Sequence, residues 1–388
     1  MPVYSLLKWV VCLQSVAPGV DAVLEVRGLF EKGDYPGAER AIVALLESNP
    51  GARPEERALL YSKLAEARIF QGISPGAVEA IEQATRLSRS RPVRRSAVMV
   101  YLRSQHYREL LEPSGSLLEE LPTDPALRFA HGVALSKMGK HELAIDDLRA
   151  ATESPEWRRD ARFELGLALS KLGRIRDALV PFREILEANP HDGEACYQTA
   201  RQLLRLKKPE PSRLAALLTR YFEALRQAEG ESSRAEHLSF AGKPLEAGLE
   251  RAARLERVGA VEAAIAEASR LRSLPGGEAP TAAWLEGLDR RLGIPALATI
   301  ADLQALLAEA PRARDSTRAS GIAKAILARD PKSRPALQCL LDSTSDPSLA
   351  VPRLHYLSRL SEVDPADAPV RTALSTLRAS FEGLAPAR

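Results

Sequence analysis

The stretches "GVALSKMGKHELAIDDL" (132–148) and "GLALSKLGRIRDALVPF" (166–182) begin 34 residues apart and have nearly the same sequence. Gly132 is matched by Gly166, and the turn residue Gly139 is matched by Gly173. A self-similar period of this length is typical of a stacked helical array, in which each repeat is one supersecondary unit. The repetition therefore predicts that the chain consists of copies of one helical unit.

Each copy contains two helical segments separated by a glycine. The apolar residues of 129–137 and of 143–148 recur at helical intervals, and Gly139 stands between them. Glycine enters the left-handed conformation without a Cβ penalty, so we expect it to end the first helix. Proline cannot continue a helix interior, so Pro155 and Pro190 close the two copies. One unit is therefore helix, tight turn, helix and break.

These residues resemble the tetratricopeptide repeat (TPR) family. That family has a small residue where the two helices of a repeat cross closely, as at Gly132, and a glycine at the turn, as at Gly139. It has a small residue on the second helix, then a large apolar residue, and a proline near the end. In the two copies these positions hold Ala144 and Ala178, Leu148 and Phe182, and Pro155 and Pro190. The resemblance implies an all-α, right-handed solenoid of stacked antiparallel helix hairpins.

The rest of the chain keeps the pattern of this repeat less completely. The resemblance is strong over 125–192, weaker over 19–124 and 193–227, and degenerate over 245–388. The stretch "GDYPGAERAIVALLESNP" (33–50), for example, fits the turn and second helix of an earlier repeat. The most C-terminal part lacks several TPR positions, so it is predicted to form helical hairpins rather than regular repeats.

The sequence predicts four regions. An N-terminal segment at 1–18 precedes a TPR-like array at 19–227. The polar, Gly- and Ser-containing stretch 228–244 has no sustained periodicity and is predicted to be a linker. The degenerate repeats at 245–388 end in a helix at about 369–383 that we expect to cap the array, because terminal repeats need a polar outer face.

The overall charge does not indicate a general nucleic-acid binder. The chain has 54 basic and 51 acidic residues, a formal net charge of +3, whereas a nucleic-acid-binding domain usually has a clear basic excess. One local basic run contains Arg86, Arg89, Arg91, Arg94 and Arg95. This run fits either a contact with RNA or another anionic surface, or a solvated helix end and loop, and the second interpretation is favoured.

The sequence contains no convincing catalytic or metal-binding motif. The three cysteines are scattered without a CxxC pair, and Cys196 is predicted to be a buried structural thiol. No GxSxG, HExxH or GxGxxG motif is present. The "AGKP" stretch (241–244) lacks the upstream glycine of a phosphate loop, and Pro244 replaces the Ser or Thr that would hold magnesium. We therefore expect no catalytic residue, metal or cofactor.

The N-terminal stretch "MPVYSLLKWVVCLQSVAPGVDA" (1–22) is open to two interpretations. Its single cation, short apolar run and small-residue ending fit a secretory signal, and the protein would then be exported or periplasmic. The apolar run is short and contains Gln14, so the stretch fits equally the first helix of the leading repeat. A cytoplasmic protein that begins at Met1 is favoured. No run reaches the ~18 apolar residues of a spanning helix.

Three functional hypotheses fit a helical-repeat chain without catalytic motifs. By the resemblance, the first helices of successive repeats line a concave groove that holds a peptide or helix of a partner protein, which makes the chain a non-enzymatic scaffold. An exported, envelope-associated assembly protein would use the same surface. The third hypothesis is an enzyme whose site forms from distant repeats, or the regulatory subunit of a separate enzyme. The scaffold is favoured, with a protein or peptide partner and no nucleic acid.

One familiar TPR ligand is disfavoured. Chaperone-binding members of the family grip a C-terminal carboxylate through Lys, Asn and Arg side chains on their first helices. At the corresponding positions this chain has Phe129 and Val133, then Glu194 and Gln198. The basic clamp is therefore absent at these positions.

Two rows of residues recur every 34 residues without being required by the repeat's packing pattern. The aromatic row is Phe129, Phe163 and Tyr197, and the basic row is Arg103, Lys137, Lys171 and Arg205. In each repeat the aromatic residue and the cation are separated by about two helical turns, so both lie on one face of the first helix. They are predicted to bind a partner segment with acidic and apolar residues. Alternatively, the aromatics fill gaps between helices and the cations complement helix ends.

Overall fold

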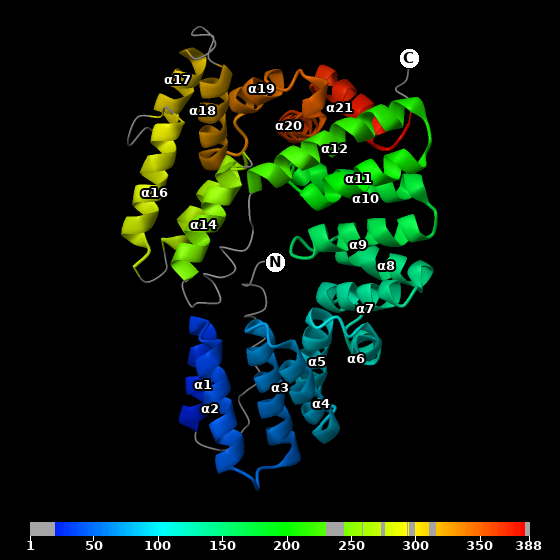
Figure 1. Ribbon diagram of the computed structural model, residues 1–388, viewed down its shortest axis with the longest axis vertical. Helices are drawn as coiled ribbons and strands as arrows, with labels where there is room; N and C mark the ends of the chain where they lie inside the picture. Colours follow the sequence, from blue (N-terminus) through cyan, green and yellow to red (C-terminus); the bar gives the residue numbers. More distant parts are fainter. Residues whose placement is uncertain are drawn as a thin grey trace. The chain divides into compact units, whose positions relative to one another are not determined.

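The computed structural model is an all-α chain (Figure 1). It describes residues 20–229, 244–257, 259–272, 276–292, 294, 299–309 and 316–384. These residues form helices, turns and loops, and they contain no β-strand. The predicted all-α fold is confirmed. The predicted N-terminal segment (1–18) and nearly all of the predicted linker (228–244) lie outside the described residues, so both stay predictions.

Two compact units make up the chain, an N-terminal unit from Met1 to Gly173 and a C-terminal unit from Arg174 to Arg388. The helices of the N-terminal unit form successive hairpins. They are α1 (Val20–Lys32) and α2 (Tyr35–Ser48), α3 (Pro54–Phe70) and α4 (Ser74–Leu87), α5 (Arg91–Arg103) and α6 (Tyr107–Glu120), α7 (Pro125–Lys137) and α8 (His141–Ala151), and the single helix α9 (Arg158–Lys171).

The α7–α8 hairpin shows how the sequence sets the limits of its helices. The carboxylate of Asp124 accepts hydrogen bonds from the backbone N–H groups of Ala126 (3.0 Å) and Leu127 (3.2 Å), which satisfies two donors at the start of α7. Pro125 follows as the first helical residue, where its missing N–H costs nothing. Gly139 ends the helix with φ +80°, so the predicted left-handed turn residue is confirmed.

The two helices of this hairpin cross at Gly132. A Cβ atom at Gly132 would lie 2.8 Å from Cγ of Leu148 and 3.2 Å from Cβ of Asp147. Both distances are too short for a side chain unless Leu148 and Asp147 shift. The prediction that a small residue occupies the close crossing is therefore confirmed for Gly132.

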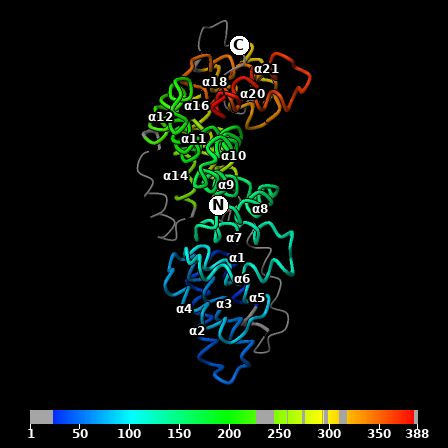
Figure 2. Tube along the Cα trace, turned by 90° about the vertical axis from the view of Figure 1, so that its right-hand side faces the viewer, coloured from blue at the N-terminus to red at the C-terminus, as the bar shows by residue number. Residues whose placement is uncertain are grey.

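Consecutive hairpins of the N-terminal unit form two layers. The first helices contact each other in the pairs α3–α5, α5–α7 and α7–α9, and the second helices pack against the next first helix in the pairs α2–α3, α4–α5, α6–α7 and α8–α9. Figures 1 and 2 show this side-by-side stacking along α1–α8. One buried apolar cluster runs through the stack, from Val26 in α1 to Ala134 in α7. Such a core grows by addition of repeats, as expected for a solenoid.

The C-terminal unit continues with helical hairpins. Its elements are α10 (Ile175–Ala188), α11 (Gly193–Arg205), α12 (Pro209–Glu229), α14 (Pro244–Arg257), α15 (Val261–Leu271), α16 (Glu278–Arg291), α17 (Ile300–Glu309), α18 (Ser316–Arg329), α19 (Arg334–Asp342), the 3-10 helix η3 (Pro347–Leu349), α20 (Ala350–Val363) and α21 (Ala368–Phe381).

The last helices of this unit pack against its first ones. Helix α20 contacts α10 and α12, and so does α21, which is the helix expected at about 369–383 (Figure 1). Phe381 at the end of α21 is fully buried. These contacts explain why the compact C-terminal unit begins at Arg174: residues far apart in the sequence share one core there.

Candidate functional site

A hollow of about 210 Å³ lies on the layer of first helices in the N-terminal unit, between α5, α7 and the start of α9. We call it the α5–α7 groove. Most of its lining is apolar. The apolar and aromatic lining residues are Val98, Met99, Leu102, Tyr107, Ala126, Phe129, Ala130, Val133 and Trp157, and the charged ones are Arg95, Arg103 and Glu164.

Two stacked aromatic rings form one side of this groove. The ring centroids of Phe129 and Trp157 lie 4.9 Å apart at an interplanar angle of 27°. Phe129 comes from the middle of α7, and Trp157 directly precedes α9. Phe129 is only 4% exposed. Stacked rings of this kind give a rigid apolar wall, because each ring limits the movement of the other.

Two of the three charged lining residues form ion pairs within the N-terminal unit. Arg95 lies 3.1 Å from a carboxylate oxygen of Asp124. Glu164 accepts hydrogen bonds of 2.9 Å from Lys137 to both of its carboxylate oxygens. These pairs offset the charges of Arg95 and Glu164 at the rim of the groove.

The third charged lining residue, Arg103, is held by aromatic rings. Its guanidinium carbon lies 5.0 Å from the ring centroid of Phe70, and the ring of Phe70 stacks on Tyr35 at 4.8 Å. Burial lowers the pKa of Arg103, and burial also raises the pKa of the Tyr35 hydroxyl. No carboxylate of the described residues lies within ion-pair distance of Arg103.

The structure places the predicted residues of the N-terminal unit at different distances from this groove. Phe129 and Arg103 line it together. Lys137 does not line the groove itself but forms an ion pair with Glu164, which does. Phe163 does not line it and lies under the guanidinium of Arg159, 5.0 Å from the ring centroid. Lys171 is exposed at the end of α9.

The predicted residues of the C-terminal unit share the exposed face of α11. Tyr197 is 48% exposed and lies 5.5 Å from the ring of Phe222, measured between centroids. Arg205 is exposed and donates a hydrogen bond of 2.9 Å to the side-chain oxygen of Gln202. Leu204 is also exposed on this helix. An aromatic and a cation are therefore both accessible here.

Sequence reasoning missed most of the apolar lining of the groove. Trp157, Tyr107 and Met99 have no counterparts at intervals of 34, so a search for recurring residues passes over them. One feature of the sequence could have pointed to Trp157: it is an aromatic residue two positions after Pro155, at the start of a helix. Its contact with Phe129 arises only when the neighbouring hairpins stack.

Four of the five arginines of the basic run at the end of α4 and the start of α5 pair with acidic side chains. Arg91 lies 2.8 Å from Glu120, Arg94 also pairs with Glu120, and Arg86 lies 3.6 Å from Glu82. Together with the pair of Arg95 and Asp124, these contacts fit the interpretation of the run as a solvated helix end and loop.

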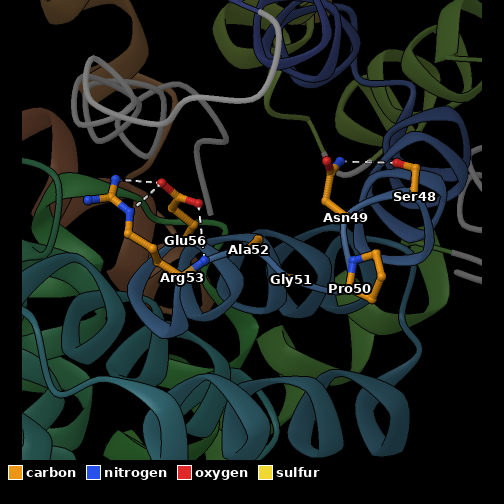
Figure 3. A pocket seen from close by; sticks show the side chains of 7 residues that line it. All are labelled: Ser48, Asn49, Pro50, Gly51, Ala52, Arg53 and Glu56. Carbon is orange, nitrogen blue, oxygen red and sulfur yellow. Dashed lines mark hydrogen bonds and ion pairs between the residues drawn. The ribbon is translucent and has the colours of Figure 1, made fainter.

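A second hollow lies at the α2–α3 loop, where Figure 3 shows its seven lining side chains. The Nε atom of Arg53 donates a hydrogen bond of 2.8 Å to Glu56, and Glu56 accepts a second one of 3.3 Å from the backbone N–H of Arg53. The side-chain amide of Asn49 donates to the hydroxyl of Ser48 at 3.1 Å. These contacts fix the loop and the start of α3, so the hollow reflects helix capping.

The described residues contain no group of three or more side chains arranged to hold a metal ion. Cys196 is fully buried and donates to the backbone oxygen of Leu218 at 3.3 Å, and burial raises its pKa to about 12. The prediction of a buried structural thiol is confirmed. In the part of the chain that the structure describes, no helix has the length and apolar character needed to cross a membrane.

The stacked hairpins, the glycine crossing and the left-handed turns define a TPR-like helical-repeat protein. Neither a model of a known protein family nor a curated protein matches the chain. Solved structures with some similarity include YrrB, a TPR protein with an unusual peptide-binding site (23% identity over 45% of this chain and 88% of that one, TM-score 0.37). Another is the C-terminal part of a TPR repeat-containing protein from Cytophaga hutchinsonii (14% identity over 81% and 98%, TM-score 0.38). The assignment rests on the geometry of this chain.

Proposed function

We propose that the protein is a non-enzymatic scaffold that binds a segment of a partner protein in the α5–α7 groove. The observation that carries this proposal is the size and lining of the groove. Its volume of about 210 Å³ lies below the ~300–1,000 Å³ typical of small-molecule and cofactor sites. A hollow of this size, walled by Phe129 and Trp157, fits one large apolar side chain.

The lining favours a protein segment for an energetic reason. A large apolar side chain that leaves water gains about 1.5–3 kcal/mol on full burial. Aromatic walls strengthen such an anchor, and interfaces gain most of their affinity from a few anchors in well-packed pockets. The groove lies on the layer of first helices, so an extended or helical segment can continue from it across neighbouring helices.

Within the N-terminal unit, Phe163 and Lys171 of the recurring rows are the proposed continuation of this surface, and both lie on α9. In the C-terminal unit, Tyr197 and Arg205 are proposed as a separate binding surface on α11. Of the cations in the rows, Lys137 is already paired with Glu164. Lys171 has no carboxylate of the described residues within ion-pair distance, which suits it to an acidic partner residue.

The test is selection from a random peptide library with the full chain as bait. Met99 lines the groove, and Met138 in the same unit does not, so Met99→Glu and Met138→Glu form a matched pair. We expect peptides selected by the wild-type chain to bind Met138→Glu unchanged and to lose binding to Met99→Glu. Thermal unfolding shows whether both variants stay folded. Equal binding to both variants, or no selected peptide at all, contradicts the proposal.

The rows are tested separately with Lys171→Glu and Phe163→Ala. If they belong to the binding surface, both substitutions reduce peptide binding while the unfolding temperature stays near that of the wild type. A large loss of stability in Phe163→Ala, with unchanged binding to Lys171→Glu, would assign the rows to packing and helix ends.

A further inference from the structure

The charged residues that line the α5–α7 groove differ in whether an oppositely charged side chain lies next to them. Arg95 and Glu164 each have an oppositely charged neighbour, Asp124 and Lys137, within 3.1 Å. Arg103 lines the same groove, yet no carboxylate of the described residues lies within ion-pair distance of it. The groove therefore contains one positive charge that the described residues of the N-terminal unit leave unbalanced.

The unbalanced charge of Arg103 costs free energy, and an aromatic ring holds its guanidinium in position. A cation that is removed from water without an anion loses hydration that nothing replaces. The guanidinium carbon lies over the ring of Phe70, 5.0 Å from its centroid, Phe70 stacks on Tyr35 at 4.8 Å, and Tyr35 contacts the edge of Phe30 at 5.9 Å. A guanidinium is planar and presents its N–H donors in a fixed fork, the geometry that binds a carboxylate through two hydrogen bonds.

We propose that Arg103 selects partner segments in which a carboxylate side chain, Asp or Glu, stands close to the apolar anchor. This inference rests on the proposed function, because it assigns the chemistry of a segment bound in the same groove. The apolar residue enters between α5 and α7 beside Phe129, and the carboxylate binds the guanidinium of Arg103 at the rim. The partner is therefore an acidic, amphipathic segment rather than a purely apolar one.

The experiment uses peptides selected by the wild-type chain and their Glu→Gln or Asp→Asn counterparts. Their affinities are measured for the wild-type chain, for Arg103→Met and for Arg40→Met. Met keeps an apolar stem on Phe70, and Arg40 is an exposed arginine of α2 outside the groove without a carboxylate partner among the described residues, so Arg40→Met controls for charge in general. Thermal unfolding confirms that each variant is folded.

We expect the loss of the peptide carboxylate to weaken binding about tenfold or more to the wild-type chain and to Arg40→Met, the effect of a hydrogen bond to a charged group. For Arg103→Met the same change in the peptide is expected to alter affinity by less than about twofold, which shows that the two groups are coupled. Arg103→Lys is expected to recover part of the preference, because it restores the charge without the planar fork.

The failure of this inference differs from the failure of the proposed function. Peptides that bind the groove without an acidic preference, or with a preference that Arg103→Met leaves unchanged, overturn the role of Arg103 and leave the scaffold in place. An equal loss of acidic preference in Arg40→Met also overturns it, since the effect would then be one of overall charge. The absence of any groove-dependent peptide removes both proposals.

Discussion

Glu187, in the last turn of α10, accepts two hydrogen bonds of 2.8 and 2.7 Å from the guanidinium of Arg378 in α21, 191 residues later in the chain. Arg183, one turn earlier, pairs with the same carboxylate and lies 3.1 Å from Glu382. Burial acts to raise the pKa of Glu187, but Arg378 and Arg183 outweigh it and hold the pKa below its usual range. Helix α21 is thus fixed to α10, the first helix of the C-terminal unit.

The contact between Glu187 and Arg378 predicts that substitution of Glu187 lowers the stability of the C-terminal unit more than substitution of Arg378 does. Glu187→Gln leaves the buried Arg183 with Glu382 as its remaining carboxylate, so we expect a loss somewhat below the ~3–5 kcal/mol that a fully uncompensated buried charge costs. The side chain of Arg378 is 39% exposed, so Arg378→Met should cost only about 1 kcal/mol, as for exposed ion pairs. Hydrogen–deuterium exchange of α10, α20 and α21 measures the difference. Similar exchange in both variants would show that Glu187 does not hold these helices together.

The crossing at Gly132 predicts that even one added carbon destabilises the N-terminal unit. Gly132→Ala places its Cβ 2.8 Å from Leu148, and such overpacking costs about 1–3 kcal/mol. Gly28 in α1 is the matched control, because no atom lies within 4 Å of a Cβ there. Gly28→Ala should stabilise by up to about 1 kcal/mol, as alanine is the better helix former. Urea unfolding of both variants checks the prediction, which an unchanged midpoint for Gly132→Ala would contradict.

The hairpin turns predict a stabilising substitution. Gln105 stands 34 residues before the turn residue Gly139 and has the same left-handed backbone, with φ +61° against +80°. A side chain in this region costs about 1–2 kcal/mol, which glycine avoids, although glycine gains entropy in the unfolded chain. We therefore expect Gln105→Gly to raise the free energy of unfolding by up to about 1 kcal/mol, and Gly139→Ala to lower it by about as much. A lower unfolding temperature for Gln105→Gly would contradict this.

Two buried histidines make the stability of the C-terminal unit depend on pH. Burial, with Lys324 and His355 nearby, lowers the pKa of His191 to about 4. Burial also lowers the pKa of His355 to about 4, although its ring N–H donates to the backbone oxygen of Glu187 at 2.6 Å. In the unfolded chain both groups take up protons near pH 6.5, so between these values the unfolded state binds more protons.

The contribution of these two histidines to the stability of this unit is therefore constant above about pH 6.5 and falls as the pH drops toward 4, by about 3 kcal/mol for each histidine. Hydrogen–deuterium exchange of α11 and α20 between pH 4 and 7 measures this slope. His355→Gln should flatten it, and His141→Gln in the N-terminal unit should leave it unchanged. A slope that His355→Gln does not alter would assign the pH dependence to other groups.

Local physical rules were enough to predict the repeating unit. The glycine at 139 ends a helix because only a residue without a Cβ enters its conformation freely, and Gly132 marks a crossing because a side chain does not fit there. Both effects act within one hairpin, so the 34-residue period contains them. The same period selected Phe129 and Arg103, which line the groove.

The hairpin, its turns and the all-α stack could therefore be predicted from the residues alone. The folded chain was needed to show which charges are already paired, as for Lys137 with Glu164, and which aromatic ring faces Phe129. It alone showed that α21 returns to α10 through Arg378 and Glu187. The physical reason is distance along the chain: periodicity fixes how neighbouring residues form a helix, whereas the contact of remote side chains depends on how complete hairpins pack.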